Sequence, residues 1–384
     1  MDDFAYLSPD AAYFDAACQS LRPAPVIQAL NDYYQNFNSC GERVKYAWGK
    51  QTDEKVAATR AKVLQYLKLS PREYFTSFTL NTTYGLNLIL SQIAPNQFVK
   101  IITSNLEHNS PFLATIAAAK RLGIPREVID REPDGSINSS HDFTKSIVVF
   151  GAVSNIDGRE LKNLKEIVKK IHQQGGIIIL DAAQALAHNA ELLAKTEADA
   201  ICASAHKMYA PSLGIIVAHK DLLPKLEVNF LGGGMVDDVE KSTFQLSAEN
   251  PAHIYTRFEA GLQAWGEIIA LGAAIDWRMQ QNTKNLMAYS KSNFEFLRGQ
   301  NRIKLLNREF SPTLSFCVEG LDSHLLGAAL SHENIMVRTG YFCAHYYLSH
   351  QNNYPPLVRV SLGLHNRESD IAKFQDAMRK VLEA

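Results

Sequence analysis

Two apolar runs in the middle of the chain constrain the fold more than any other feature. Residues 177–180 are β-branched and aliphatic, and the run is apolar on both faces, as in a strand buried inside a parallel sheet. This run ends at Asp181, and a second apolar run at residues 198–203 leads into Lys207. Ligands of open α/β sheets bind at the carboxyl ends of the strands. We therefore expect Asp181 and Lys207 to face the same ligand.

An aspartate and an amine that face one ligand suit pyridoxal phosphate. A lysine amine forms a Schiff base with the aldehyde, and a carboxylate keeps the pyridine nitrogen protonated so that the ring withdraws electrons. Each residue alone has an ordinary explanation, because an aspartate after a strand often caps a helix and a single lysine is usually solvated. The pair in this arrangement predicts a pyridoxal phosphate site.

The composition argues against several other classes of protein. The formal charge of −1 gives no reason to expect nucleic acid as a partner. We see no apolar stretch long enough for a bilayer, and the acidic start does not resemble a signal peptide, so we expect a cytoplasmic protein without membrane contact. The five cysteines are widely spaced and form no Cys-x-x-Cys pair, which indicates neither a zinc site nor a disulfide framework.

The apolar periodicity predicts alternating strands and helices, which would form right-handed crossover units around a central sheet. A length of 384 residues favours two domains. We expect a loop at 41–50, helices at 53–67, 160–174 and 267–280, and strands at 75–80, 99–103, 146–150, 177–180, 198–203 and 215–218.

Polar side chains follow three of the other expected strands. The sequence Asn81-Thr82-Thr83 opens a helix, where hydroxyl and free N–H groups suit a phosphate but also suit a simple N-cap. His108 follows the strand at 99–103, and a single histidine is more often an ordinary polar residue than a ligand contact. Asn155 belongs to an Asn-x-x-Gly sequence that also suits a turn. The residues alone leave these alternatives open.

These motifs, taken together and in order, resemble one known family. Residues 181–185 (Asp-Ala-Ala-Gln-Ala) and 204–209 (Ser-Ala-His-Lys-Met-Tyr) are similar to motifs of the class V aminotransferases of PLP fold type I, specifically the cysteine desulfurases and selenocysteine lyases. The resemblance extends from about Tyr13 to the C-terminus. It implies an α/β fold with a mostly parallel central sheet wrapped by helices. It divides the chain into a lead-in segment at 1–25, a large PLP-binding domain at 26–261 and a smaller α+β domain at 262–384 that carries a cysteine loop.

The resemblance also implies a role for each polar residue around the cofactor. Lys207 would carry pyridoxal 5'-phosphate, and Asp181 would pair with its pyridine nitrogen. His108 would stack on the ring and shuttle protons. The ring side would contact Asn155 and Gln184, and the phosphate would contact Thr82, Thr83, Ser204 and His206.

The C-terminal third contains the residues that the resemblance assigns to the substrate. Cys343 follows Arg338 in an Arg-x-Gly-x-x-Cys motif and would be the nucleophile, whereas the other four cysteines would be structural. Arg359 and Arg338, together with Asn155, would bind the substrate. The implied reaction is the conversion of L-cysteine to L-alanine, or the equivalent reaction of selenocysteine, with transfer of the sulfur to an enzyme persulfide.

Several alternatives share this scaffold. An aminotransferase, an epimerase or a C–S lyase would keep Lys207 and Asp181 without needing Cys343, and a binding protein could have lost catalysis. Leu262 stands where relatives commonly have a threonine that reaches the phosphate of a neighbouring subunit, and it has no hydroxyl for that contact. The family still implies a homodimer and a protein that accepts the sulfur. The sequence does not choose between cysteine and selenocysteine.

Overall fold

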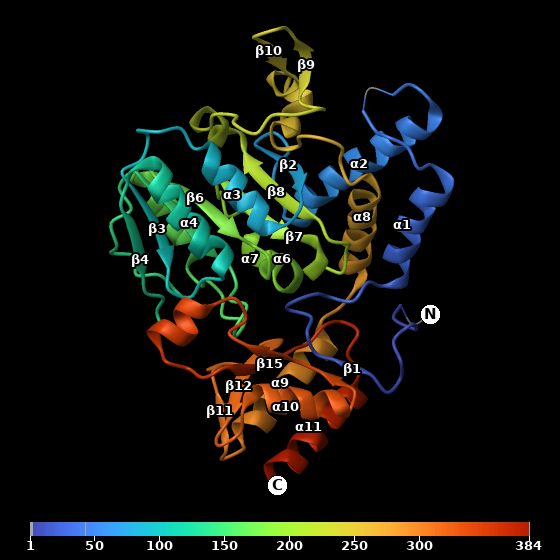
Figure 1. Ribbon diagram of the computed structural model, residues 1–384, viewed down its shortest axis with the longest axis vertical. Helices are drawn as coiled ribbons and strands as arrows, with labels where there is room; N and C mark the ends of the chain where they lie inside the picture. Colours follow the sequence, from blue (N-terminus) through green and yellow to red (C-terminus); the bar gives the residue numbers. More distant parts are fainter. Residues whose placement is uncertain (1–2, 43, 384) are drawn as a thin grey trace.

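The computed structural model describes residues 3–42 and 44–383, and it contains two main sheets of unequal size. Figure 1 shows the larger sheet among helices in the upper part of the molecule and the smaller sheet beneath it with the C-terminal helices. The larger sheet has the strand order β2-β8-β7-β6-β5-β3-β4. Its strands are β2 (Tyr74–Thr79), β3 (Lys100–Ser104), β4 (Arg126–Ile129), β5 (Ser146–Gly151), β6 (Ile177–Asp181), β7 (Ala200–Ser204) and β8 (Gly214–His219).

The larger sheet is mostly parallel, as the sequence predicts, but it is mixed because β8 runs against both of its neighbours. Only the segment 205–213 separates β7 from β8. A parallel strand would need a crossover of a dozen residues or more, so the short connection forces an antiparallel pair. The expected pattern of crossover units therefore ends at β7.

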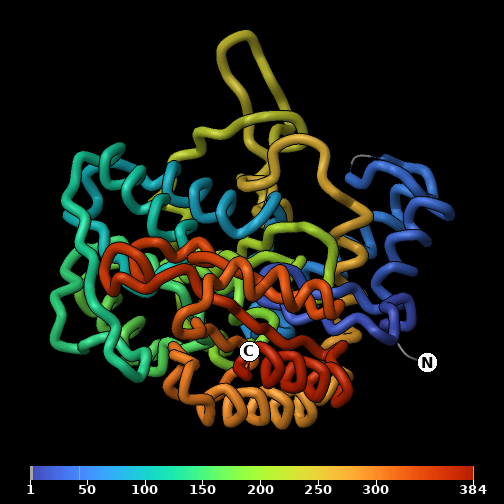
Figure 2. The backbone as a smooth tube through the Cα atoms, turned by 60° about the horizontal axis from the view of Figure 1, so that its bottom comes forward, coloured from blue at the N-terminus to red at the C-terminus, as the bar shows by residue number. Residues whose placement is uncertain are grey.

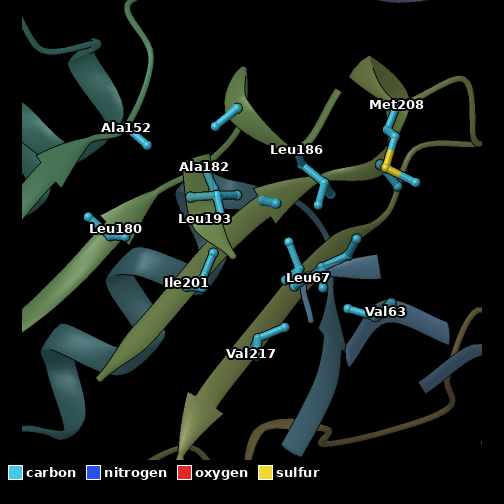
Figure 3. Packing of buried hydrophobic residues seen from close by; sticks show 14 of the residues in the cluster. Val63, Leu67, Ala152, Leu180, Ala182, Leu186, Leu193, Ile201, Met208 and Val217 are labelled. Atoms are coloured by element: carbon cyan, nitrogen blue, oxygen red, sulfur yellow. The ribbon is translucent and has the colours of Figure 1, made fainter. Parts of the chain in front are cut away.

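The strand at residues 177–181 is apolar on both faces because helices cover both sides of the sheet. Ile177 and Ile179 pack in one core with α3 (Thr82–Gln92) and α4 (Asn109–Leu122). Ile178 and Leu180 pack in the opposite core. Figure 3 labels Leu180, Ile201, Val217, Val63 and Leu67 as members of that second core. Each such side chain contributes about 1.5–3 kcal/mol by burial. The helices of the second face are α1 (Ala24–Asn36), α2 (Ala47–Tyr66), α5 (Leu164–Gln173) and α8 (Trp265–Gln280).

Two expected helix boundaries are wrong, each for a local reason. The helix predicted from residue 53 begins at Ala47, so part of the loop expected at 41–50 is helical. Asp53 therefore lies inside this helix, where its carboxylate accepts from the backbone N–H of Glu42. The helix predicted from residue 160 begins at Leu164, because Leu161 N–H donates to Ala152 O in a strand-like contact (2.9 Å).

The smaller sheet is antiparallel and has the strand order β11-β12-β15-β14. Phe14 of the lead-in segment lies in its core, and β1 (Ala12–Tyr13) pairs with β13 (Ile335–Met336), so the start of the chain belongs to the packing of its end. The strands are β11 (Ile303–Leu305), β12 (Thr313–Val318), β14 (Arg338–Gly340) and β15 (Leu357–Ser361), and the helices are α9 (Lys284–Arg298), α10 (Ser323–His332) and α11 (Glu368–Glu383).

The domain boundaries at residues 25 and 261 stay predictions. Helix α8 lies just beyond the second boundary, and it packs against α1 and α2 on the larger sheet. A hairpin of β9 (Val236–Val239) and β10 (Phe244–Leu246) stands clear of the rest of the chain in both views (Figures 1 and 2). Among the described residues, no helix is long and apolar enough to cross a membrane.

Candidate active site

A cavity of about 290 Å³ lies where the carboxyl ends of the larger sheet meet the smaller sheet. It is lined from three directions: by the turn that follows β1, by the ends of the parallel strands, and by β14, β15 and the loop between them. Every residue that the sequence proposes for cofactor, substrate or nucleophile lines this cavity: Thr82, Thr83, His108, Asn155, Asp181, Gln184, Ser204, His206, Lys207, Arg338, Cys343 and Arg359. Their individual roles stay predictions.

Asp181 and Lys207 share this cavity because they end neighbouring strands. Asp181 is the last residue of β6, and Lys207 closes the short turn η1 (Ala205–Lys207) after β7. Burial raises the pKa of Asp181, while the Ala183 N–H and the charge of Lys207 oppose that shift. Burial lowers the pKa of Lys207, and Asp181 opposes that shift. A carboxylate that is costly to bury and an amine that readily gives up its proton suit an acid–base site.

The hydroxyl groups at the start of α3 form a second cluster. Asn81 caps this helix, because its side-chain oxygen accepts from Tyr84 N–H (2.9 Å). The hydroxyl groups of Thr82 and Ser204 are 2.6 Å apart, and Thr82 N–H donates to Ser204 Oγ (2.9 Å). Because Asn81 provides the cap, Thr82 and Thr83 are left to line the cavity. A helix N-terminus with such hydroxyl groups suits an anion.

His108 is the N-cap of α4, and its ring is neutral. Its Nδ1 accepts from Ser110 N–H (3.0 Å), so the ring caps the helix and its proton is on Nε2. Burial, together with the charges of Lys207 and Arg359, lowers the pKa of His108 to about 3. Burial likewise lowers the pKa of His206 to about 4. Both imidazoles are therefore neutral at pH 7 and can donate one hydrogen bond each.

Two amide side chains connect the strand ends to other segments. Gln184 Nε2 donates to Ala17 O (2.7 Å), and among the described residues its buried Oε1 has no hydrogen-bond partner. Asn155 Nδ2 donates to Phe342 O (2.7 Å), which ties the end of β5 to the cysteine loop. A buried acceptor without a partner, in a residue that lines a cavity, is costly unless a bound molecule supplies the donor.

The cysteine loop has an unfavourable backbone conformation. Phe342 and Cys343 are consecutive non-glycine residues with positive φ angles of 50° and 58°. Such residues cost of order 1 kcal/mol or more each and persist only where their surroundings hold them. Two hydrogen bonds hold the loop here. Asn109 N–H donates to Cys343 O (2.6 Å), and Asn155 Nδ2 donates to Phe342 O. The half-buried thiol of Cys343 thus lies on a strained segment held by its neighbours.

The two arginines meet an acidic residue that the sequence reasoning did not select. Arg359 Nη2 binds Asp15 Oδ1 (2.8 Å), and its guanidinium lies over the Phe342 ring, 5.0 Å from the centroid. Arg338 Nη1 lies 3.8 Å from Asp15 Oδ2 and donates to Cys18 Sγ. Among the described residues, Arg359 Nε has no partner. Both residues lie within the resemblance, which begins at about Tyr13, and this was the available signal for Asp15 and Cys18.

Behind His108 lies a buried ion pair that the sequence reasoning also missed. Glu107 and Arg131 join at 3.0 Å, with side chains that are 1% and 2% exposed. Glu107 also accepts from Gly151 N–H (2.7 Å), and Arg131 donates to Gly151 O (2.6 Å). The pair therefore fixes the turn after β3 against the end of β5.

Comparison with known proteins finds one matching family model and full-length relatives. The family model described as aminotransferase class-V matches residues 12–374. A probable cysteine desulfurase of Pyrococcus abyssi is 26% identical, covering 98% of this chain and 96% of its own length. A cysteine desulfurase of Escherichia coli K12 is 27% identical, covering 99% of this chain and 96% of its own length.

Solved structures show the same fold. The apo structure of the cysteine desulfurase from Thermococcus onnurineus has a TM-score of 0.88 and 25% identity, and covers 97% of this chain and 95% of its own. A cysteine desulfurase structure from Escherichia coli has a TM-score of 0.87 and 21% identity, and covers 99% of this chain and 97% of its own. These likenesses agree with the fold class predicted from the sequence.

Proposed function

The chain belongs to the aminotransferase class-V family of pyridoxal-phosphate-dependent enzymes, and we propose that it is a cysteine desulfurase that converts L-cysteine to L-alanine. The observation that carries the proposal is the position of Cys343, whose thiol lines the same cavity as Asp181 and Lys207. An aminotransferase or an epimerase would have no use for that thiol. Alanine and an enzyme persulfide would be the products.

The residues around the cavity fit pyridoxal phosphate. The hydroxyl groups at the start of α3 suit its phosphate, and the unpartnered Oε1 of Gln184 suits a donor on the ring side. The buried carboxylate of Asp181 suits a positively charged nitrogen, which would offset the cost of burying it. The residues that would hold the group are Thr82, Thr83, His108, Asn155, Asp181, Gln184, Ser204, His206 and Lys207.

When bound, this cofactor supplies an aldehyde for the substrate amine and a ring that withdraws electrons from Cα. Lys207 Nζ exchanges a proton with the substrate Cα, a role that suits an amine whose pKa burial lowers. His108 donates from Nε2 and carries no charge. Arg359 and Arg338 bind the substrate carboxylate, because a guanidinium forms two parallel hydrogen bonds with it.

The sulfur step uses Cys343 as the nucleophile. Its thiolate attacks the substrate Sγ, a sulfur–sulfur bond forms, and the bond between Cβ and sulfur breaks. The electron pair of that bond stays with carbon, and Cβ takes up a proton to give alanine. Cys343 is left as a persulfide. A serine hydroxyl cannot replace the thiolate at neutral pH.

The decisive experiment compares Cys343→Ser with Cys40→Ser, which changes an exposed thiol outside the cavity. We expect Cys343→Ser to keep its yellow cofactor and to lose alanine formation from L-cysteine, by at least about 10³-fold. Cys40→Ser should turn over like the unchanged protein, and a gain of one sulfur should appear on the Cys343 peptide. Unchanged alanine formation by Cys343→Ser would instead indicate a C–S lyase, and a keto acid product would indicate an aminotransferase.

The proposal includes a homodimer, a protein that accepts the sulfur, and L-cysteine rather than selenocysteine as the substrate. Exposed apolar side chains around the hairpin support a second copy as a partner: Phe230, Leu231, Val239, Phe244 and Leu262. Light scattering tests the dimer. Parallel assays with L-cysteine and selenocysteine test the substrate, since a selenolate leaves carbon more readily and needs Cys343 less.

A further inference from the structure

The cavity contains a second thiol besides Cys343. Cys18 lies in the turn after β1, and both cysteines are half-buried and line the cavity. Cys40, Cys202 and Cys317 do not line it. The sequence predicted a structural role for Cys18, but the residue lines the cavity that we propose for the substrate.

An arginine holds the sulfur of Cys18. Arg338 Nη1 donates to Cys18 Sγ, and the same guanidinium lies 3.8 Å from Asp15 Oδ2. The turn is closed by Cys18 N–H, which donates to Asp15 O (3.0 Å). A guanidinium binds anionic sulfur more strongly than a neutral thiol, so Arg338 offers a charge-assisted hydrogen bond to a sulfur anion at this position.

The turn of Cys18 and the loop of Cys343 are joined by two arginines. Arg338 lies on β14, which leads directly into the loop, and it reaches Cys18. Arg359 binds Asp15 in the turn and lies over the ring of Phe342, the residue before Cys343. Lys207 is also near both: burial lowers its pKa, and the charges of Cys18 and Cys343 are among those that oppose the shift.

The geometry points to Cys18 as a second sulfur-carrying residue, which takes the sulfane sulfur from the persulfide of Cys343 inside the cavity. The thiolate of Cys18 attacks the outer sulfur of the Cys343 persulfide. A sulfur–sulfur bond forms at Cys18, the bond between the outer sulfur and Cys343 Sγ breaks, and Cys343 leaves as a thiolate. One persulfide is exchanged for another, so the step needs no oxidant or reductant.

The transfer frees Cys343 for a second substrate while the first sulfur stays bound at Cys18. The persulfide on Cys18 would keep its contact with Arg338, which stabilises its negative charge. This inference rests on the proposed desulfurase function, because the sulfur must first reach Cys343. Each chain would then hold about two sulfur atoms before an external acceptor is needed, since each thiol that accumulates a covalent product adds one equivalent to the burst.

The test measures the burst of alanine from the holoenzyme with L-cysteine by rapid quenching, without any other thiol. We expect about two alanines per chain from the unchanged protein and about one from Cys18→Ser, a twofold difference. Cys40→Ser, the matched change at a thiol outside the cavity, should give the same burst as the unchanged protein. Alkylation followed by peptide mass spectrometry should find added sulfur on both Cys18 and Cys343.

The unchanged protein decides the question even where a variant fails to fold. Sulfur on Cys343 alone, with a burst of about one alanine per chain, would overturn the role of Cys18 and leave the desulfurase function standing. A disulfide between the two cysteines in place of a Cys18 persulfide would overturn it as well. Sulfur on Cys18 in Cys343→Ser would show direct attack on the substrate and reject the transfer. No alanine burst and no persulfide would reject the proposed function itself.

Discussion

The two walls of the cavity are built in opposite ways. The strand-end wall, with Asp181 and Ser204, consists of the last residues of paired, buried strands. Asp181 accepts from Ala183 N–H in the turn after β6, and the Ser204 hydroxyl bonds to Thr82 at the start of α3. The loop wall, with Phe342 and Cys343, has left-handed backbone angles and a half-buried thiol. Two hydrogen bonds, from Asn109 and Asn155, hold it against the first wall.

The difference follows from what each wall must do. Cofactor chemistry needs donors and charges at fixed positions, because a small misplacement weakens every electrostatic interaction in the site. In the proposed function, the thiol of Cys343 must reach the substrate and then another acceptor, which a rigid strand would prevent. Strain on the loop lowers the cost of leaving the observed conformation. Substitutions on the strand-end wall should therefore cost much more than substitutions on the loop wall, except where the reacting atom itself is lost.

The largest effect is expected for Lys207→Ala on the strand-end wall. In the role that we propose for Lys207, loss of the amine removes both the covalent attachment of the cofactor and the base at Cα, so alanine formation should fall by about 10⁴-fold. Borohydride treatment of the unchanged protein should fix the cofactor on the peptide that contains Lys207. Labelling of any other lysine would contradict the assignment.

The next largest effect is a loss of stability, and we expect it when one member of the buried ion pair next to His108 is removed. Arg131→Met leaves Glu107 buried without its partner, so the free energy of unfolding should fall by about 3–5 kcal/mol. Denaturant titration measures the change. The exposed pair of Lys68 and Glu191 is the matched control, and Lys68→Met should change stability by less than about 1 kcal/mol. Equal losses of unfolding free energy in the two variants would show that the pair of Glu107 and Arg131 does not stabilise the strand-end wall.

The neutral ring of His108 should make the protein less stable in acid. Its pKa is about 3 in the folded chain, below its value near 6.5 in the unfolded chain, so the unfolded state takes up the proton first. Stability is lost as the pH falls from about 6.5 toward 4, and His108→Gln should lose about 1–3 kcal/mol less over that window. The exposed His332 provides the control, because His332→Gln should follow the unchanged protein. Parallel curves for all three proteins would contradict the burial argument.

The smallest effect on stability is expected on the loop wall. Cys343→Ser should change the free energy of unfolding by no more than about 0.5 kcal/mol, although it abolishes the proposed chemistry. Thermal unfolding of the cofactor-free protein measures this. A loss as large as that of Arg131→Met would show that the two walls are equally rigid and would remove the distinction between them.

Local sequence patterns predicted the residues of the strand-end wall, but they did not predict the hydrogen bonds and ion pairs that hold this wall in place. The run at residues 177–180 is apolar on both faces and ends in a carboxylate, so its place in the sheet and at the cavity could be read directly. Asn81 as the true cap of α3 and the start of α2 at Ala47 depend on individual hydrogen bonds. The pair of Glu107 with Arg131 and the contact of Arg338 with Cys18 join distant segments, and no local pattern records such contacts.

The pairing of β1 with β13 also determines when the site can assemble. More than three hundred residues separate its two strands. The core around Phe14 is likewise complete only after the segment with β13 has been synthesised. At a synthesis rate of about 5–20 residues per second, the turn that carries Asp15 and Cys18 is exposed for tens of seconds before its partners leave the ribosome. Arg338, which contacts Cys18, and Cys343 follow β13 closely in the chain, so a nascent chain has its strand-end wall before it has the thiol that we propose as the sulfur carrier.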